Sequence, residues 1–437
     1  MSGEPTKKAL VLGFGSSGQA AARLLQRQGH AVVVADENIK SVAGFERVNE
    51  LAPALVASLS LAVVSPGIPA HHPWLKKLHA AGVRVVPEFE YGLSALPDAR
   101  VIAVTGSNGK SSVVKWIAQT LSLAGKHAVP AGNYGLPVCE VALEKEPPEF
   151  IVLEVSSFQL EQNVDFHPEF ALMINFAPNH LDRHGSMEAY ARAKMKMFTA
   201  HARPGTSIFH APAWRELKAL AGLDIKPLLF GRESKLDYTF ADGWVWKRNQ
   251  RWCDLSGTWW SLYPQANNAA AACAVFERLD VPGVTAREAA MEFQPLPHRM
   301  QLLTVWKGIH VVNDAKCSSL TALAAAVSAS RGRKHVIAGG LLKEKDPGLI
   351  KQLLADNDVE LYLIGDAART LYDAWHDGIT CEICGDLEHA VKLALERARA
   401  GERVLFSPGC ASFDQFSSYA ERGEKFKQLV LACTGQS

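Results

Sequence analysis

Residues 101–125 read VIAVTGSNGKSSVVKWIAQTLSLAG, and this stretch decides the fold of the middle of the chain. The apolar run 101–104 predicts a buried strand that ends at the first glycine. After the second glycine, apolar residues recur at positions 113, 117, 121 and 124, which lie on one face of a helix, and Gly125 is a typical helix end. A strand, a glycine-rich turn and a helix in this order predict an α/β domain with a ligand loop.

The turn resembles a phosphate-binding loop but does not match the usual consensus sequence, G-x-x-x-x-G-K-[ST], because Val104 stands where the first glycine is expected. Gly106 and Gly109 would let backbone amides turn toward phosphate oxygens. Lys110 would neutralise the outer phosphates, and Ser111 would offer a hydroxyl to magnesium. The alternative is a tight turn that binds no ligand. The strand, the lysine and the serine all occur at the positions that a phosphate-binding loop requires, which disfavours this alternative.

A second glycine-rich turn follows residues 8–13, KALVLG, which predict a strand near the N-terminus. Gly13, Gly15 and Gly18 form G-x-G-x-x-G, and Asp36 ends the next apolar run, AVVVAD. In a dinucleotide site, backbone amides and a helix N-terminus receive the diphosphate and such a carboxylate holds a ribose. The match alone favours NAD and a dehydrogenase, with a structural turn as the alternative. The physics indicates only a bound nucleotide diphosphate.

Candidate metal ligands follow the next apolar runs of the central segment. Glu154 ends a strand-like run in IVLEVSSFQLE, a position suited to reaching a metal beside the loop. His180 follows the next run and has i, i+4 spacing with His184. A zinc-protease site is disfavoured, because no glutamate follows the first histidine and no third ligand is evident.

The composition predicts a soluble, cytoplasmic protein. Lys and Arg number 46 and Asp and Glu 45, so the formal charge of +1 gives no reason to expect a nucleic acid or a membrane as partner. The N-terminal apolar run is too short for a signal peptide. The uncharged stretch 51–70 contains prolines and predicts a buried helix and strand instead of a membrane span. Eight scattered cysteines indicate a reducing compartment; Cys381 and Cys384 form one CxxC, for which redox use is a minority alternative.

Strand-like and helix-like segments alternate along the chain, which favours parallel sheets with right-handed crossovers. We predict three consecutive α/β domains, residues 1–97, 98–296 and 297–437, of which the first and last are Rossmann-like. Between Trp244 and Trp260 lie five of the ten tryptophans, alternating with polar residues after an Asp-Gly turn. This pattern predicts β-hairpins, in which packing is favoured over a platform that stacks nucleic-acid bases.

Seven motifs occur in the order found in one enzyme family: TGSNGKSS, GNYGLP, LEVSSFQLE, NHLDRHGSMEAYARAK, PHRM, NDAK and SPGCASFDQF. The chain resembles the Mur ligases over essentially its whole length. The combination of SSFQLE with CASFDQF is most similar to the members that add D-glutamate to UDP-N-acetylmuramoyl-L-alanine, in cytoplasmic peptidoglycan precursor synthesis. The resemblance implies a P-loop ATPase-like central domain, the small-molecule substrates ATP, UDP-N-acetylmuramoyl-L-alanine and D-glutamate, and Mg²⁺ at two sites. We expect a monomer.

The resemblance also implies a mechanism and residues for the phosphate-binding loop. ATP transfers its γ-phosphoryl group to the L-alanine carboxylate, and the amine of glutamate then displaces phosphate. The implied catalytic residues are Lys110, Glu154, His180 and Lys194, with Ser111, Glu154, His180 and a carbamoylated Lys194 serving magnesium. The implied ATP-binding residues are Gly106, Ser107, Asn108, Gly109, Lys110, Ser111, Ser112, Gln265, Asn268, Arg299, Asp314 and Lys316.

The first glycine loop is reinterpreted by the resemblance, because in this family it receives UDP instead of NAD. The implied contacts of the UDP substrate are Gly15, Ser16, Ser17, Asp36, Ser65, Pro66, Gly67 and Asn133. The implied site for the incoming amino acid comprises Ser318, Lys343, Ser412, Phe413 and Tyr419.

Three alternatives stay open at this point. A ligase of the same family could add another amino acid, L-glutamate included, because the sequence does not determine chirality. A NAD-dependent dehydrogenase would use the first loop but leave the second unexplained. A nucleotide sensor without catalysis would keep both loops but would not need Glu154, His180 and Lys194.

Overall fold

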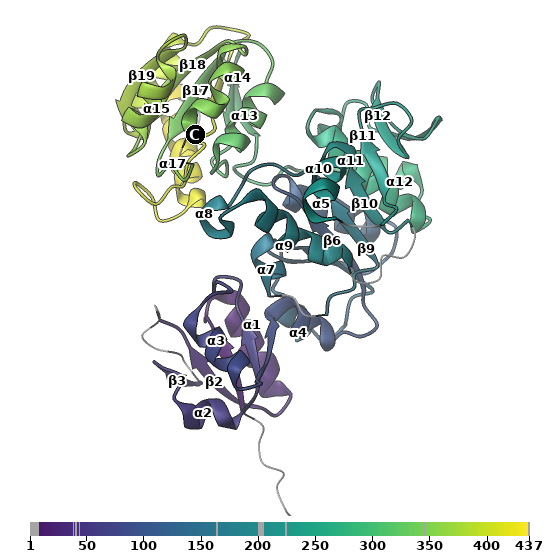
Figure 1. The fold of residues 1–437 in the computed structure, drawn as a ribbon. Coiled ribbons are helices and arrows are strands. Elements are labelled where there is room, and N and C mark those ends of the chain that lie inside the picture. Colours follow the sequence, from purple (N-terminus) through teal and green to yellow (C-terminus); the bar gives the residue numbers. More distant parts are fainter. Residues whose placement is uncertain are drawn as a thin grey trace, which may run out of the picture. The chain divides into compact units, whose positions relative to one another are not determined.

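The computed structural model describes residues 8–37, 39, 42, 44–162, 165–199, 205–222, 225–344 and 346–435. The chain divides into two compact units: the first comprises Met1–Phe176, Gly185–Ser261 and Gln265–Glu292, and the second Ala177–His184, Leu262–Pro264 and Phe293–Ser437. The described residues form three sheets, two in the first unit and one in the second, and helices cover their faces (Figure 1). The chain therefore has the predicted architecture of three α/β domains.

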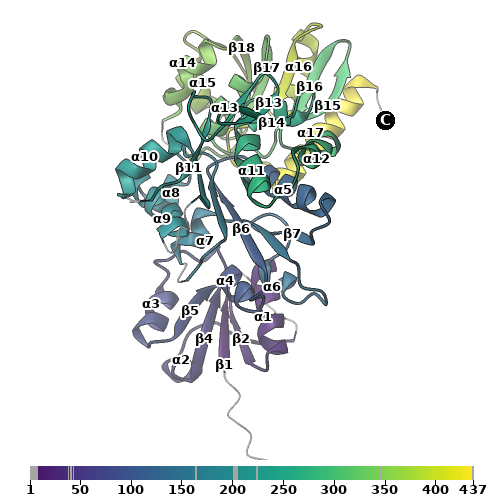
Figure 2. The ribbon, with the colours of Figure 1, turned by 90° about the vertical axis from the view of Figure 1, so that its right-hand side faces the viewer.

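The N-terminal sheet has five parallel strands in the order β3-β2-β1-β4-β5 (Figure 2). Its central strand, β1, is apolar after its first residue, Lys8, because both faces are covered: Leu10 and Leu12 pack into one core, and Ala9 and Val11 into another. The chain runs outward from β1 to β3 and returns to β4 on the other side of β1, which creates a switch point where ligands bind. The elements are β1 (Lys8–Leu12), α1 (Ser16–Arg27), β2 (Ala31–Ala35), β3 (Glu46–Val48), α2 (Pro53–Ser58), β4 (Leu59–Val64), α3 (Pro73–Ala80), β5 (Arg84–Pro87) and α4 (Glu88–Ser94).

The uncharged stretch 51–70 forms α2 and β4, as its prolines predicted. In the described part of the chain, no helix combines the length and the apolarity that crossing a membrane requires.

The central sheet has nine strands in the order β14-β13-β12-β11-β10-β9-β6-β8-β7. Strands β6 to β12 run parallel, and β12, β13 and β14 form the antiparallel hairpins that the tryptophan-rich segment predicted. The elements are β6 (Arg100–Thr105), α5 (Lys110–Leu123), β7 (Ala128–Gly132), α6 (Val138–Val141), β8 (Phe150–Glu154), α7 (Ser157–Glu161), β9 (Phe170–Met173), α9 (Met187–Thr199), β10 (Ser207–His210), α10 (Ala211–Ala221), β11 (Leu228–Gly231), β12 (Tyr238–Ala241), β13 (Trp244–Lys247), β14 (Gln250–Asp254), η1 (Trp259–Ser261), α11 (Gln265–Arg278) and α12 (Gly283–Glu292).

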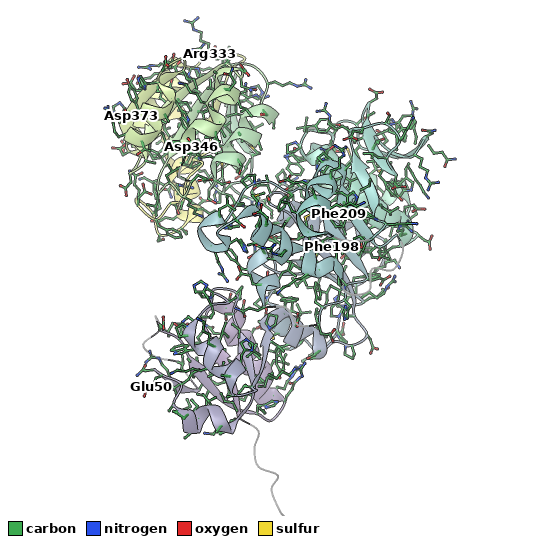
Figure 3. The ribbon with its side chains drawn as sticks, in the orientation of Figure 1. Glu50, Phe198, Phe209, Arg333, Asp346 and Asp373 are labelled. Atoms are coloured by element: carbon green, nitrogen blue, oxygen red, sulfur yellow. The ribbon has the colours of Figure 1, made fainter. Side chains whose placement is uncertain are left out.

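Aromatic side chains fill the core around this sheet. Trp260 is fully buried and stacks on Trp116 of α5, with 4.3 Å between the ring centroids, so packing accounts for this tryptophan. Phe198 of α9 and Phe209 of β10 lie inside the domain with their ring centroids 4.3 Å apart (Figure 3). The first pair joins η1 to α5, the helix that follows the phosphate-binding loop, and the second joins α9 to β10.

The C-terminal sheet has six strands in the order β15-β16-β20-β17-β18-β19. Only β15 runs antiparallel to its neighbour, and the other strands are parallel. The elements of the second unit are α8 (Leu181–His184), β15 (Gln301–Trp306), β16 (Ile309–Asn313), α13 (Leu320–Ala329), β17 (Lys334–Gly339), η2 (Pro347–Ile350), α14 (Lys351–Ala355), β18 (Val359–Ile364), α15 (Ala368–Trp375), β19 (Thr380–Gly385), α16 (Leu387–Arg397), β20 (Arg403–Phe406) and α17 (Tyr419–Thr434).

Both cysteines of the CxxC pair belong to β19, which is an edge strand of this sheet. Burial raises the pKa of each thiol to about 11, so neither is a reactive thiolate at neutral pH. No group of three or more His, Cys, Asp or Glu side chains suited to a metal occurs among the described residues. The structure therefore gives no support to redox use of this pair.

Candidate active site

The phosphate-binding loop joins β6 to α5 through a backbone that requires glycine. Gly106 and Gly109 have φ values of 154° and 84°, which L side chains rarely adopt. A Cβ atom at Gly106 would lie 2.7 Å from Cγ1 of Ile174, and one at Gly109 would lie 2.7 Å from Nδ2 of Asn268. Both glycines are therefore needed for the turn and for the close approach of neighbouring elements.

Lys110 reaches back over this loop. Its Nζ atom donates hydrogen bonds to the carbonyl oxygens of Gly106 at 3.0 Å and Ser107 at 3.2 Å. The ammonium group thus lies near the N-terminus of α5, where the helix dipole also favours anions. Ser107 in the loop and Ser112 in the first turn of α5 are also buried. The arrangement suits the phosphates of a nucleotide.

A hydroxyl and a carboxylate meet beside the loop. Glu154 is the last residue of β8 and is 2% exposed. Its Oε2 atom accepts a hydrogen bond from Ser111 Oγ at 2.5 Å, and its Oε1 atom accepts one from Asn133 Nδ2 at 2.9 Å. Hard oxygen donors such as these fit Mg²⁺, which takes few protein ligands and keeps several waters. Ser111 and Glu154, predicted together from the sequence, are therefore brought together by the fold.

Lys194 of α9 lies in the interior beside the same loop, with 1% of its surface exposed. Its Nζ atom donates hydrogen bonds to Thr105 Oγ1 at 3.1 Å and to the carbonyl oxygen of Gly106 at 3.0 Å. Burial, reinforced by the Lys110 ammonium and opposed by Glu154, lowers the pKa of Lys194 well below its ordinary value. The site thus favours the neutral amine, which is the form that can react with carbon dioxide.

Tyr190 belongs to this cluster, although the sequence reasoning missed it. Its hydroxyl lies 3.1 Å from Ser107 Oγ, and its ring centroid lies 4.8 Å from Lys194 Nζ. Burial raises the pKa of Tyr190 to about 12, so the side chain remains a neutral hydroxyl. The available signal was its i, i+4 spacing from Lys194, which places both side chains on one face of α9.

Helix α11 begins at Gln265 and brings Asn268 against the loop. Asn268 is 6% exposed, and its amide lies where a side chain at Gly109 would be. The buried alanines that follow, Ala269–Ala272, have small side chains and so permit close packing of α11. Asn268 is therefore placed at the loop, and Gln265 one helical turn before it.

The N-terminal glycine loop lines a pocket of about 310 Å³ at the switch point of the first sheet. A Cβ atom at Gly18 would lie 1.9 Å from the carbonyl oxygen of Gly13, so α1 can approach β1 only with glycine there. Asp36 accepts hydrogen bonds from the backbone N–H groups of Phe14 at 2.7 Å and Ile39 at 3.1 Å. The pocket contains all the predicted UDP contacts except Asn133, and its lining is Gly13, Gly15, Ser16, Ser17, Asp36, Ser65, Pro66, Gly67 and Ile68.

Asn133 lies instead beside Glu154, in the loop after β7. It is thus placed with the magnesium-type donors, while the other predicted UDP contacts surround the N-terminal pocket.

In the second unit, predicted ATP-binding residues gather at the carboxyl end of the sheet. Asp314 follows β16 and is 9% exposed; its carboxylate accepts hydrogen bonds from Met300 N at 3.1 Å and Ser407 Oγ at 2.9 Å. Burial raises the pKa of Asp314 to about 7, although these hydrogen bonds and the positive charge of Arg299 act to lower it. Lys316 Nζ lies 3.6 Å from the ring centroid of Tyr419, so a predicted ATP contact and a predicted amino-acid contact meet.

The other predicted amino-acid contacts also follow strand ends of this sheet. Ser412 is buried, whereas Phe413 is 70% exposed and Tyr419 39% exposed. Phe413 is therefore not a core residue. Lys343 is exposed and Ser318 is half-buried. Leu341 and Ala411 exchange backbone hydrogen bonds at 2.9 Å, which holds the loops of Lys343 and Ser412 together.

His180 lies in the segment Ala177–His184, which belongs to the second unit, and its φ value is 56°. Its carbonyl oxygen accepts hydrogen bonds from the N–H groups of Arg183 and His184, the last two residues of α8. Ser111 and Glu154 belong to the first unit and His180 to the second, so the metal role of His180 stays a prediction.

Family models match three successive parts of the chain. They are described as the Mur ligase MurD-like N-terminal domain, residues 7–87, the Mur ligase middle domain, residues 104–251, and the Mur ligase glutamate ligase domain, residues 298–410. These parts correspond to the three sheets.

Curated relatives match at full length. The UDP-N-acetylmuramoylalanine–D-glutamate ligase of Acidobacterium capsulatum is 32% identical, over 98% of this chain and 97% of its own. The enzyme of the same name from Methylobacillus flagellatus is 33% identical, over 97% of this chain and 96% of its own.

Among solved structures, the MurF ligase of Thermotoga maritima in complex with ADP has a TM-score of 0.62 at 17% identity, covering 99% of this chain and 96% of its own. The UDP-N-acetylmuramate–alanine ligase of the same organism has a TM-score of 0.61 at 17% identity, over 97% and 99%. The structural matches support the same fold, and the relatives and the domain models together establish that this chain belongs to the Mur ligase family.

Proposed function

We propose that this protein catalyses the ATP-dependent addition of D-glutamate to UDP-N-acetylmuramoyl-L-alanine, in peptidoglycan precursor synthesis. The observation that carries the proposal is the full-length match to ligases of this name. It is supported by the loop at Lys110, with Ser111 and Glu154 in contact and Lys194 buried beside them. We also propose a monomer in the cytoplasm.

In the proposed reaction, the L-alanine carboxylate attacks the γ-phosphorus of ATP, which breaks the bond to the β-phosphate oxygen and releases ADP. The amine of D-glutamate then attacks the acyl phosphate carbon, loses a proton and expels inorganic phosphate, so that an amide bond replaces the acyl–oxygen bond. Lys110 and the N-terminus of α5 hold the phosphates and stabilise the charge that develops on them.

The remaining residue roles form part of the proposal. Ser111 and Glu154 would hold one magnesium ion, and His180 would serve a second. Carbamoylated Lys194 would help to position a magnesium ion. When bound, Mg²⁺ supplies positive charge that neutralises the phosphate oxygens. Gln265, Asn268, Arg299, Asp314 and Lys316 bind the rest of ATP. The N-terminal pocket binds UDP, and Ser318, Lys343, Ser412, Phe413 and Tyr419 bind D-glutamate.

The test is an assay of phosphate release in a matrix of substrates. UDP-N-acetylmuramoyl-L-alanine, UDP-N-acetylmuramate and longer precursors are each combined with D-glutamate, L-glutamate and other amino acids, with ATP and Mg²⁺. We expect phosphate and an amide product only with the L-alanine precursor and D-glutamate. Preference for another pair would overturn the substrate assignment, and phosphate release that needs neither acceptor would overturn the ligase assignment.

A further inference from the structure

The phosphate-binding loop is held from outside by Asn175, which follows β9 by two residues. Its Oδ1 atom accepts hydrogen bonds from the backbone N–H groups of Ser107 and Asn108, each at 2.9 Å. Its Nδ2 atom donates to the carbonyl oxygen of Asn108 at 2.7 Å. One amide side chain therefore binds both polar groups of the Asn108 backbone.

The loop is short, which explains why its backbone needs a hydrogen-bonding partner from another segment of the chain. Only Ser107 and Asn108 separate the two glycines, and the backbone in this turn is not part of a strand or a helix. Backbone N–H and C=O groups that are removed from water need partners. Gly106 permits this arrangement, because a Cβ atom there would come within 3.2 Å of the Asn175 carbonyl oxygen.

These contacts also determine which backbone N–H groups of the loop can face a phosphate. The N–H groups of Ser107 and Asn108 point at Asn175, so they are not the groups that receive a phosphate oxygen. Phosphate binding then rests on the second half of the loop, from Gly109 into the first turn of α5, together with Lys110. Tyr190 bonds the side chain of Ser107 at 3.1 Å but does not contribute to holding the backbone of Asn108.

We propose that Asn175 is a positioning residue for ATP: its amide fixes the first half of the short loop so that the second half faces the phosphates. The inference rests on the ATP site of the proposed function, and it is independent of which amino acid is added. Two substitutions separate the functions of the amide. Asn175→Ala removes both the acceptor and the donor, whereas Asn175→Asp keeps the acceptor, loses the donor to Asn108 and adds a negative charge near the phosphates.

The experiment measures the Kd of ATP with Mg²⁺ by calorimetry on the full chain, for the wild type and both variants. We expect the affinity to fall about tenfold or more in each variant, and further in Asn175→Asp because of its charge. The KM for ATP should rise accordingly, while the Kd of the UDP substrate stays within about twofold of the wild type. The matched control is Asn357→Asp, two residues after α14 in the second unit, whose side-chain amide donates a hydrogen bond to the Leu353 carbonyl oxygen at 2.8 Å.

Thermal unfolding of each variant accompanies the titrations. If Asn175→Ala does not fold, the nearly isosteric Asn175→Asp decides the question. ATP binding within about twofold of the wild type in the folded variants would overturn the proposal, as would an equal loss of affinity for ATP and for the UDP substrate, since a general structural defect weakens both. Failure of the substrate matrix with normal ATP binding would instead count against the proposed reaction alone.

Discussion

Three lysines with different proposed roles lie in three different environments, and the environment determines what each amine can do. Lys110 extends over a loop at a helix N-terminus, Lys194 is enclosed in the interior, and Lys343 is exposed on a loop of the second unit. A charged ammonium suits phosphate, a neutral amine suits carbon dioxide, and an exposed ammonium suits a soluble carboxylate ligand.

For Lys110, we predict that substitution by alanine reduces turnover about 10²-fold or more, because a preorganised charge is removed from phosphoryl transfer. The unfolding midpoint should change little, since the amine donates hydrogen bonds to carbonyl groups of the loop and does not fill a core. Steady-state kinetics and thermal unfolding check this. Lys392→Ala, which removes an exposed lysine paired with Glu388 on α16, is the control. Near-normal turnover of Lys110→Ala would exclude the phosphate role.

For Lys194, we predict a dependence of stability on pH. Because its pKa is lowered in the folded state, the unfolded chain binds more protons between that lowered value and the ordinary 10.5. In buffer free of carbon dioxide, the unfolding free energy of the wild type should therefore rise with pH across this window relative to Lys194→Met, which cannot titrate. Urea unfolding over a pH series measures the difference. A difference that does not change with pH would mean that the amine is not desolvated.

Carbamoylation of Lys194 makes a separate prediction. With ¹³C-labelled bicarbonate, the wild type should show a carbamate carbon signal that is absent from Lys194→Met. Lys194→Ala should be nearly inactive and recover part of its activity when short-chain carboxylates replace the carbamate oxygens. Full activity of this variant without any addition would contradict the assignment.

For Lys343, we predict that substitution by alanine raises the KM for D-glutamate while the KM for the UDP substrate changes much less. Loss of a charge-assisted hydrogen bond costs about 1.5–3 kcal/mol, which corresponds to roughly ten- to a hundredfold. Initial-rate kinetics with each substrate varied in turn provide the measurement. An unchanged KM for D-glutamate would point to another cation; Lys345, the next candidate in the sequence, lies outside the described residues.

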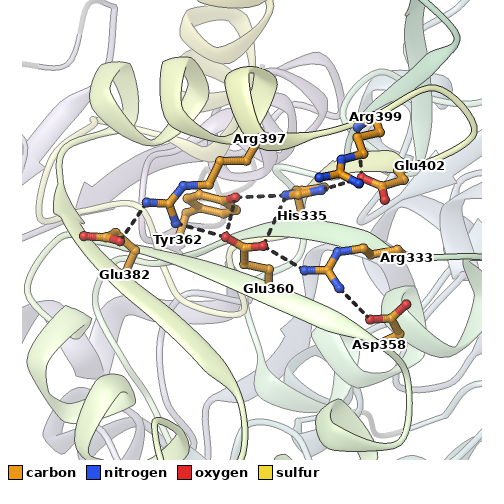
Figure 4. Close-up of polar contacts among 9 residues, drawn as sticks. All are labelled: Arg333, His335, Asp358, Glu360, Tyr362, Glu382, Arg397, Arg399 and Glu402. Carbon is orange, nitrogen blue, oxygen red and sulfur yellow. Dashed lines mark hydrogen bonds and ion pairs between the residues drawn. The ribbon is translucent and has the colours of Figure 1, made fainter.

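At the scale of secondary-structure elements, a charged cluster joins the amino ends of β17, β18 and β20 in the C-terminal sheet (Figure 4). Glu360 is 6% exposed and accepts hydrogen bonds from Arg397 Nη1, Tyr362 Oη and Arg333 Nη2 at 3.0, 3.0 and 3.1 Å. His335 lies beside them, 2.9 Å from both the Tyr362 hydroxyl and a carboxylate oxygen of Glu402. The cluster lies at the opposite ends of the strands from Asp314 and Ser407, so it serves the fold and not the proposed site.

We predict that Glu360→Gln lowers the unfolding free energy by about 1–3 kcal/mol at neutral pH, because it weakens hydrogen bonds to two charged partners. Burial raises the pKa of Glu360, but the bonds from Arg397, Tyr362 and Arg333 together outweigh it, so the pKa is lowered overall. The stabilisation by Glu360 is therefore present above the ordinary carboxyl pKa and is lost as the pH falls through the lowered value.

Urea unfolding at neutral and acidic pH tests this prediction. The difference between the wild type and Glu360→Gln should shrink in acid, while the kcat of the folded variant stays unchanged. Glu388→Gln, in an exposed pair on α16, is the control and should cost much less. An equal loss of stability in both variants would show that burial of the Glu360 cluster does not matter.

At the scale of the whole molecule, the proposed ATP contacts belong to two compact units. Asn268 and the loop lie in the first unit, whereas Arg299, Asp314 and Lys316 lie in the second. If one nucleotide binds to both sets, ligand binding must couple the positions of the units. We predict that an ATP analogue and the UDP substrate together decrease the radius of gyration in small-angle X-ray scattering. The UDP substrate alone should have less effect, and an unchanged radius at saturation would contradict closure.

The buried strands and the ligand loops were predictable from the sequence because their signals are local. The apolar runs of β1, β6 and β8 and the glycines at 106 and 109 encode a strand and a turn within a few residues, and the structure confirms them. Edge strands such as β15 and β19 were not predicted, since an edge strand is partly solvated and its apolar pattern is weaker. The motif order in the sequence also identified the family.

Tertiary structure alone decided which side chains act together and in which protonation state. In the sequence, Lys194 is an ordinary helical lysine; only the packing of α9 against the loop buries its amine and lowers its pKa. The contact of Ser111 with Glu154, and that of Asn175 with Asn108, each join residues more than forty positions apart. Periodicity and spacing report the local path of the backbone, whereas desolvation and hydrogen bonding depend on elements that meet only when the chain folds.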